Sequence, residues 1–228
     1  MADSPALDSF LDKWRQRWPE WSLASVFVAP TQREVAVAWF ALLQEFENVL
    51  NISGDPLPAD AKLAWWGEEL RDWSRHRSRH PLGRVLEPCK APWAALAETL
   101  PRLVEARGMA ADGGHALALL QPLGEAIAAV EQALFGAAAD ARVVNVASVQ
   151  LLASRWLEGE HAGASELAAA KALLAQWSSS RVGGRPRRLW SAFARARLAR
   201  FVAAGKPTPL PSPMRLLWTA WWAAAGAR

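Results

Sequence analysis

The pattern of apolar and polar positions is clearest between residues 33 and 86, where it predicts two helices joined by a turn. In the first helix, apolar residues recur three and four positions apart, which is the spacing of one buried helical face. These residues are Val35, Trp39, Leu42, Leu43, Phe46, Val49 and Leu50. The turn at 53–56 ends this helix, because its Gly and Pro interrupt helical hydrogen bonding. The second helix starts at Pro58 and ends in basic residues before Pro81.

The second helix has an apolar side and a charged side. Its apolar side consists of Leu63, Trp66, Leu70 and Trp73. Its charged side consists of Glu68, Glu69, Arg71 and Asp72. We expect the apolar side to be buried and the charged side, including the pair of glutamates, to face solvent.

Helix-forming residues continue along the rest of the chain, interrupted by Gly and Pro. We expect further helices at 8–17, 19–27, 82–89, 93–107, 115–135, 141–157, 165–177, 187–204 and 214–225. Pro101 should kink or break its helix, and Ser165 should cap the helix that it precedes. Since β-branched runs are rare and no repeat or long linker divides the chain, we predict an all-α fold with one helical-bundle domain over residues 1–228.

Composition indicates the environment of the protein. Apolar residues make up 52% of the 228 residues, which is enough to form a large core. A single cysteine, Cys89, excludes an internal disulfide and fits a reducing compartment. The N-terminal segment is polar and acidic, unlike a secretory signal, and no apolar run reaches the ~18–20 residues of a spanning helix. We therefore expect a cytoplasmic protein, either soluble or peripheral to a membrane.

The positive charge is concentrated in one stretch of the chain. The net charge is +4, and residues 181–200 contain several arginines and no acidic residue. These arginines are Arg181, Arg185, Arg187, Arg188, Arg195, Arg197 and Arg200. Such a stretch can meet phosphates, diphosphates, anionic lipid or an acidic partner. The simplest interpretation is a solvated helix face.

The chain contains 14 tryptophans, most of them at helical spacing with Leu and Ala. This spacing predicts that they pack in the core. Trp218, Trp221 and Trp222 lie in the last predicted helix, together with Met214. That helix can close the bundle, which we favour, or lie at a membrane interface.

A family resemblance is carried by residues of the first two helices and the segment after them. These residues are Ala38, Ala41, Leu42, Glu45, Lys62, Leu63, Trp65, Trp66, Glu69, Leu70, His80 and Pro81. In this order they resemble the squalene/phytoene synthase family of head-to-head prenyl transferases, and its proteobacterial and mitochondrial branch in particular. Just upstream, Phe27, Pro30 and Arg33 resemble the family's entry to the same helix. The match is specific over about the first third of the chain.

The resemblance implies an isoprenoid-synthase-like bundle around a central cavity. In the active synthases, two aspartate-rich motifs hold Mg²⁺ against the diphosphate leaving group. When the chain is matched on Ala41 and Leu42, the first motif falls on Leu50, Asn51 and Gly54. The second motif, which follows Gln150, falls on Ala153, Trp156 and Leu157. None of these residues is a carboxylate, and the tyrosine of the classical active cavity has no counterpart because the chain contains no Tyr.

We therefore predict a protein that has lost prenyl transfer, with no catalytic residue, no metal ligand and no cofactor. We expect it to bind an isoprenoid diphosphate or an apolar ligand, or else a protein partner. The candidate ligand-binding residues are Arg33, Glu45, Asn51, Asp55, Gln150 and Glu158. Mitochondrial relatives of this branch, which assist respiratory complex I assembly, give a precedent for a partner role by resemblance.

Two alternatives are open. The first is an active Mg²⁺-dependent prenyl transferase of isoprenoid biosynthesis that uses displaced acids. These acids are Asp55, Asp60, Glu158 and Glu160. The second is a binder of anionic surfaces that works through residues 181–200, for which nucleic acid is an unlikely target. His76 and His80 have the i, i+4 spacing of metal ligands, but the arginines between them favour a basic helix end.

Overall fold

The computed structural model confirms the all-α fold: it is helical without strands over the residues that it describes, which are 5–52, 54–109, 113–157, 163–178 and 181–225. The α-helices are α1 (Pro5–Arg17), α2 (Trp21–Ala24), α3 (Pro30–Leu50), α4 (Leu57–Trp73), α5 (Gly83–Leu86), α6 (Trp93–Thr99), α7 (Pro101–Gly108), α8 (Gly113–Phe135), α9 (Ala141–Ala153), α10 (Ala164–Gln176), α11 (Arg185–Ala204) and α12 (Pro213–Ala224). Two short 3-10 segments, η1 (Ser25–Phe27) and η2 (Ser154–Trp156), directly follow α2 and α9.

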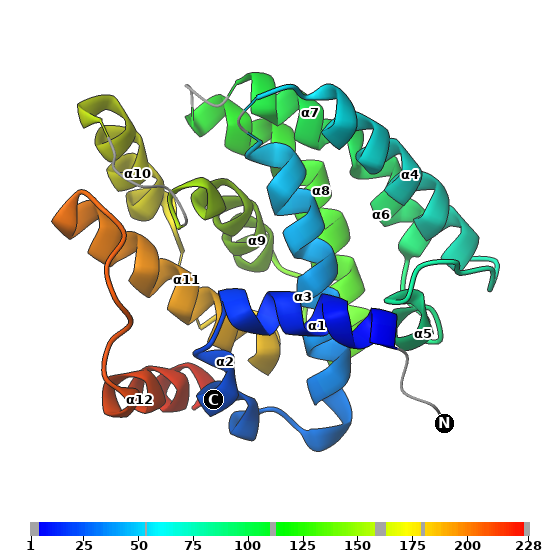
Figure 1. The fold of residues 1–228 in the computed structure, drawn as a ribbon, viewed down its shortest axis with the longest axis horizontal. Helices are drawn as coiled ribbons and strands as arrows, with labels where there is room; N and C mark the ends of the chain where they lie inside the picture. The colour runs from blue at the N-terminus through cyan, green and yellow to red at the C-terminus, as the bar shows by residue number, and fades with distance from the viewer. Residues whose placement is uncertain (1–4, 53, 110–112, 158–162, 179–180, 226–228) are drawn as a thin grey trace.

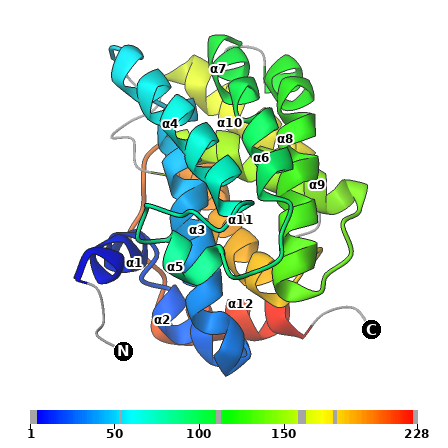
Figure 2. The same cartoon turned by 90° about the vertical axis from the view of Figure 1, so that its right-hand side faces the viewer.

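Helices α3 and α8 lie at the centre of the bundle (Figure 1). Helices α4, α6 and α7 pack on one side of them, and α9, α10 and α11 lie on the other side. Helix α1 crosses α3, and α12 packs against α11 and α2 at one end of the molecule (Figures 1 and 2). The apolar faces of these helices share one hydrophobic core.

The start of α3 and the end of α4 follow from local backbone preferences. Helix α3 starts at Pro30, because the fixed φ of proline suits the first helical turn and its missing N–H is not needed there. Helix α4 ends at Trp73, earlier than the predicted end near Pro81. Its continuation is interrupted at His76, which adopts a left-handed backbone conformation with φ 58°.

The starts of α7 and α10 test two further predictions, a break at Pro101 and a cap at Ser165. Pro101 is the first residue of α7 and is separated from α6 by Leu100, which confirms the predicted break. The predicted cap at Ser165 is wrong. Helix α10 starts at Ala164, and the backbone N–H of Gly163 donates a hydrogen bond of 3.0 Å to the Glu166 carboxylate.

Tryptophans form much of the core, as their spacing predicts. Trp14, Trp18, Trp39, Trp66, Trp73, Trp93 and Trp190 are almost completely buried. The Phe40 and Trp190 rings, from α3 and α11, are 4.3 Å apart between centroids, and Trp14 of α1 packs against both. The prediction fails for the last helix, where Trp218, Trp221 and Trp222 are exposed.

Helices α8 and α9 approach each other closely at Gly124. A Cβ atom at this position would lie 2.5 Å from the Ser148 hydroxyl oxygen and 3.0 Å from the Val144 carbonyl oxygen. Any larger side chain at residue 124 would therefore push the two helices apart. This contact fixes the position of α9, whose C-terminal end forms part of the candidate site.

Candidate functional site

The C-terminal end of α3 meets the C-terminal end of α9, and this is the place where the resemblance puts the two metal-binding motifs. Asn51 caps α3, and its side-chain amide donates hydrogen bonds to the Leu151 carbonyl (3.0 Å) and to the Ser154 hydroxyl. The same amide also donates to the Glu47 carbonyl of α3, at 3.0 Å. A neutral amide thus bridges the two helix ends directly.

The other positions matched to the two motifs are apolar or face solvent. Leu50 and Ala153 are fully buried, Trp156 and Leu157 are half-buried, and Gly54 is exposed in the turn after α3. The hydrogen bonds of the Asn51 amide therefore connect these helix ends. The described residues place no carboxylate at any of the matched positions.

The displaced acids of the alternative enzyme hypothesis have other roles where they are described. The Asp55 carboxylate accepts a hydrogen bond of 3.0 Å from the backbone N–H of Leu57, at the start of α4. Asp60 forms an ion pair with Arg107 of α7, with an Oδ1 to Nη2 distance of 2.8 Å. Glu158 and Glu160 lie outside the described residues. Within the described part, no group of three or more His, Cys, Asp or Glu side chains is arranged to hold a metal ion.

Arg33 and Glu45 lie away from the bridge formed by Asn51. Arg33 is in the first turn of α3, so about 27 Å of helix separates it from Asn51 at the other end. Its guanidinium is exposed and donates a hydrogen bond of 3.1 Å to the Val28 carbonyl. Glu45 pairs with Lys62 and ties α3 to α4. The structure therefore does not bring these two candidates together with Asn51.

The interior of the bundle contains a buried ion pair that the sequence analysis did not identify. Glu131 of α8 and Arg187 of α11 are each 1% exposed, and Arg187 Nε lies 2.9 Å from Glu131 Oε1 and 3.0 Å from Oε2. Trp39 of α3 donates its indole N–H to Glu131 Oε1 at 2.9 Å. The candidate Gln150 of α9 accepts from Arg187 Nη1 at 3.2 Å. Side chains of four helices, α3, α8, α9 and α11, thus meet at one buried polar cluster.

A second arginine of the basic stretch is also paired. Arg197 binds Glu20 through two hydrogen bonds of 2.8 and 2.6 Å, and its guanidinium lies 4.1 Å from the Trp18 ring centroid. The interpretation of residues 181–200 as a solvated face is therefore wrong for Arg187 and Arg197. Their acidic partners are far away in sequence, so a local charge count does not reveal them.

Another buried carboxylate, Glu69, organises the segment after α4. Its Oε1 atom accepts hydrogen bonds from the backbone N–H groups of Arg79 and His80, both at 2.7 Å, and from the Trp73 indole at 2.8 Å. Arg79 Nε adds a bond of 3.2 Å to Oε2. Burial raises the pKa of Glu69, but these donors outweigh burial and the net pKa is lowered. The expected exposure of the Glu68–Glu69 pair is correct for Glu68 and wrong for Glu69, which is 0% exposed.

His80 completes this cluster and is held as a neutral ring. Its Nδ1 atom accepts a hydrogen bond of 3.2 Å from the backbone N–H of Leu82, and its ring centroid lies 4.5 Å from both Phe10 and Trp66. Burial lowers the pKa of His80 to about 4, although the nearby Glu69 charge raises it and Lys62 lowers it further. Several residues that carry the family resemblance, namely Trp65, Trp66, Glu69 and His80, therefore hold one loop in place.

The pKa of His80 predicts an acid-labile fold. In the unfolded chain His80 binds a proton near its usual pKa of 6.5, whereas in the folded protein it does so only near 4. The free energy of unfolding should therefore fall as the pH decreases between these two values. Urea unfolding at a series of pH values should show this slope, and His80→Phe should flatten it. Parallel curves for the two proteins in this range would contradict the assignment.

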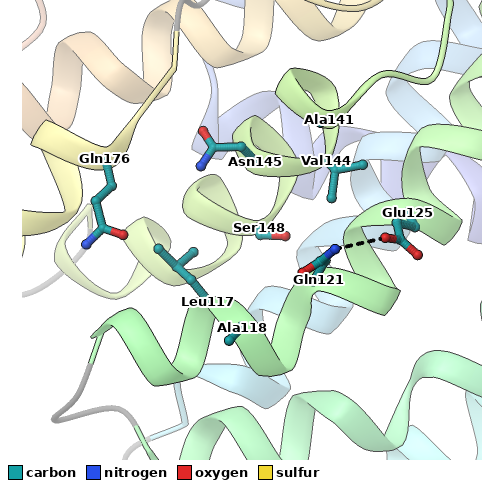
Figure 3. Close-up of a pocket in the computed structure, with 9 residues that line it drawn as sticks. All are labelled: Leu117, Ala118, Gln121, Glu125, Ala141, Val144, Asn145, Ser148 and Gln176. Carbon is teal, nitrogen blue, oxygen red and sulfur yellow. Dashed lines mark hydrogen bonds between the residues drawn. The ribbon is translucent and has the colours of Figure 1, made fainter.

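A groove of about 370 Å³ lies between α8, α9 and the end of α10 (Figure 3). Its lining residues are Leu117, Ala118, Gln121, Glu125, Ala141, Val144, Asn145, Ser148 and Gln176. The Glu125 carboxylate accepts a hydrogen bond of 3.1 Å from Gln121, and Asn145 Oδ1 accepts from the backbone N–H and the hydroxyl of Ser178. These hydrogen bonds hold several of the polar side chains that line the groove.

Comparison of the chain with protein-family models, curated proteins and solved structures finds no match. Over the described residues, every helix is too short or too polar to cross a membrane. The resemblance therefore stays a prediction, and functional proposals depend on the side-chain arrangement described above.

Proposed function

We propose that the protein is a non-catalytic scaffold of the squalene/phytoene synthase type, which binds an apolar ligand or a protein partner and does not transfer a prenyl group. The observation that carries this proposal is the bridge from the Asn51 amide to Leu151 and Ser154. It lies where two sets of carboxylates would face each other in an active synthase of this type.

The chemistry of the bridge supports loss of catalysis. Departure of a diphosphate creates negative charge that Mg²⁺ ions neutralise, and these ions need several oxygen ligands, mostly carboxylates, around one space. A carboxamide that donates to a carbonyl and a hydroxyl has no negative charge to offer. It also joins the two helix ends by direct contacts, where metal ions and diphosphate would need room.

The buried charges nearby do not replace the missing carboxylates. Glu131 is already neutralised by Arg187 and receives the Trp39 indole N–H. Asp60 is neutralised by Arg107. Recruiting either acid to a metal would leave an arginine without its partner, and for Arg187 this would be a buried charge. These pairs favour a structural role for the acids over the alternative of an active prenyl transferase.

Calorimetric titration with farnesyl and geranylgeranyl diphosphate, with and without Mg²⁺, tests the proposal. We expect no Mg²⁺-dependent heat and no release of diphosphate. Titration with farnesol, which has the same apolar chain and no phosphate, is the matched control. Equal binding of farnesol and the diphosphate would identify an apolar-ligand scaffold, and binding of neither would leave the protein-partner role. Binding that requires Mg²⁺, accompanied by diphosphate release, would contradict the proposal.

A further inference from the structure

Helix α12 turns its largest apolar side chains toward solvent. Met214, Trp218, Trp221 and Trp222 are 75%, 65%, 50% and 51% exposed, respectively. We call these four side chains the α12 aromatic face. At 100° per residue they lie on the side of the helix opposite Leu216, Ala220 and Ala223, which are buried.

The prediction that α12 closes the bundle is therefore correct for only one side of the helix. The buried side contacts α11 and α2 through small and aliphatic residues, whereas the aromatic side is uncovered. The Trp218 and Trp221 rings lie 5.2 Å apart and form a continuous surface. Val26 of η1, which is 62% exposed, belongs to an element that also contacts α12. A cluster of exposed tryptophans of this size marks an interaction surface.

Arginines lie beside the α12 aromatic face. The Arg181 guanidinium lies 3.1 Å from the Trp222 ring centroid, and Arg188 Nη2 donates a hydrogen bond of 3.3 Å to the Ala224 carbonyl. Burial lowers the pKa of Arg188, and the charges of Arg185 and Arg181 lower it further. Arg215 adds a charge on α12 itself, and the sequence contains no Asp or Glu after Glu166.

We propose that the α12 aromatic face docks the protein onto an anionic lipid surface. Indole rings favour the headgroup region of a bilayer, because each has a large apolar body and one polar N–H. The arginines beside this face would meet the lipid phosphates, and each basic group near such a surface adds attraction. Helix α12 lies at one end of the molecule, beside α2 and α11 (Figures 1 and 2), and its aromatic side chains are exposed there, as in helices that lie in the interface of a bilayer.

The same charges argue against a second copy of the chain as the occupant. In a symmetric dimer built on this face, each aromatic patch would meet its own equivalent, and the two sets of arginines would repel each other. The face is also the convex side of a single helix, whereas a groove would be expected for a bound peptide helix. A lipid surface fits both the convex shape of the α12 aromatic face and the positive charge beside it.

Vesicle co-sedimentation of the full chain tests this inference. We expect binding to phosphatidylcholine vesicles that contain about 30% phosphatidylglycerol, weaker binding to pure phosphatidylcholine, and release as NaCl is raised from about 0.1 M to about 0.5 M. The triple variant Trp218→Ser, Trp221→Ser, Trp222→Ser should bind at least about tenfold more weakly, because most of the apolar contact is lost. Arg185→Gln with Arg215→Gln should reduce the difference between the two kinds of vesicle.

The matched control carries Leu57→Ser and Val104→Ser, which remove exposed apolar side chains from α4 and α7. It should bind vesicles as the unmodified protein does, and circular dichroism should show that all variants remain folded. Absence of binding to the anionic vesicles, or equal binding by the tryptophan variant, would overturn the inference. So would a dimer in solution that the tryptophan variant abolishes, because the face would then be an interface between copies. Failure here would leave the proposed loss of catalysis unaffected, because calorimetry tests that separately.

Discussion

We expect Arg187→Met to lower the free energy of unfolding by about 3–5 kcal/mol, because it leaves the Glu131 carboxylate buried without a cation. Arg187 and Glu131 are each 1% exposed, and water cannot replace the lost hydrogen bonds without opening the bundle. The guanidinium also lies 5.0 Å from the Trp190 ring centroid, so its loss removes a favourable ring contact as well.

Chemical denaturation followed by tryptophan fluorescence measures this loss. Arg195→Met is the matched control, since Arg195 lies on the same helix and is exposed, and it should change stability by less than about 0.5 kcal/mol. Adding Glu131→Gln to Arg187→Met should restore part of the lost stability, because a neutral amide costs less to bury than an unpaired carboxylate. Similar effects of Arg187→Met and Arg195→Met would contradict the structural role of the ion pair.

The second large effect is expected for Glu69→Ala, at about 2–4 kcal/mol. This change leaves the partly buried backbone N–H groups of Arg79 and His80 and the buried Trp73 indole without the acceptor that Glu69 provides. The loop after α4 should then detach from the Trp66 and Phe10 contacts of His80. Hydrogen exchange should become faster at residues 79 and 80, which would locate the effect in this loop.

Glu68→Ala provides the control for Glu69, because the neighbouring side chain is exposed and should tolerate the change. The pKa of Glu69 is lowered in the folded protein, so its contribution is present at pH values above the usual 4.5 and is lost as the pH falls through the folded value. The difference in stability between the unmodified protein and Glu69→Ala should therefore shrink in acid. An equal loss for both alanine variants at neutral pH would show that Glu69 does not organise the loop.

The sequence alone determined the helices, because the apolar spacing and the Pro and Gly breaks that define them are local. The spacing along α3 identified its buried face, and Pro101 separated α6 from α7 as expected. The absence of carboxylates at the motif positions was also a property of the sequence. Helix ends were less certain, since caps such as Gly163 depend on the local backbone conformation.

Only the tertiary structure decided which polar side chains are buried and what they bind. Glu131 and Arg187 are 56 positions apart, and Asn51 and Ser154 are 103 apart, so no local pattern pairs them. An acid within the apolar face of α8 was the available signal for Glu131, but it does not name the partner. The local sequence also does not reveal which side of α12 is buried, because both of its sides carry apolar residues. The packing of α11 and α2 decides which side is covered, and this depends on contacts that form only when distant helices come together.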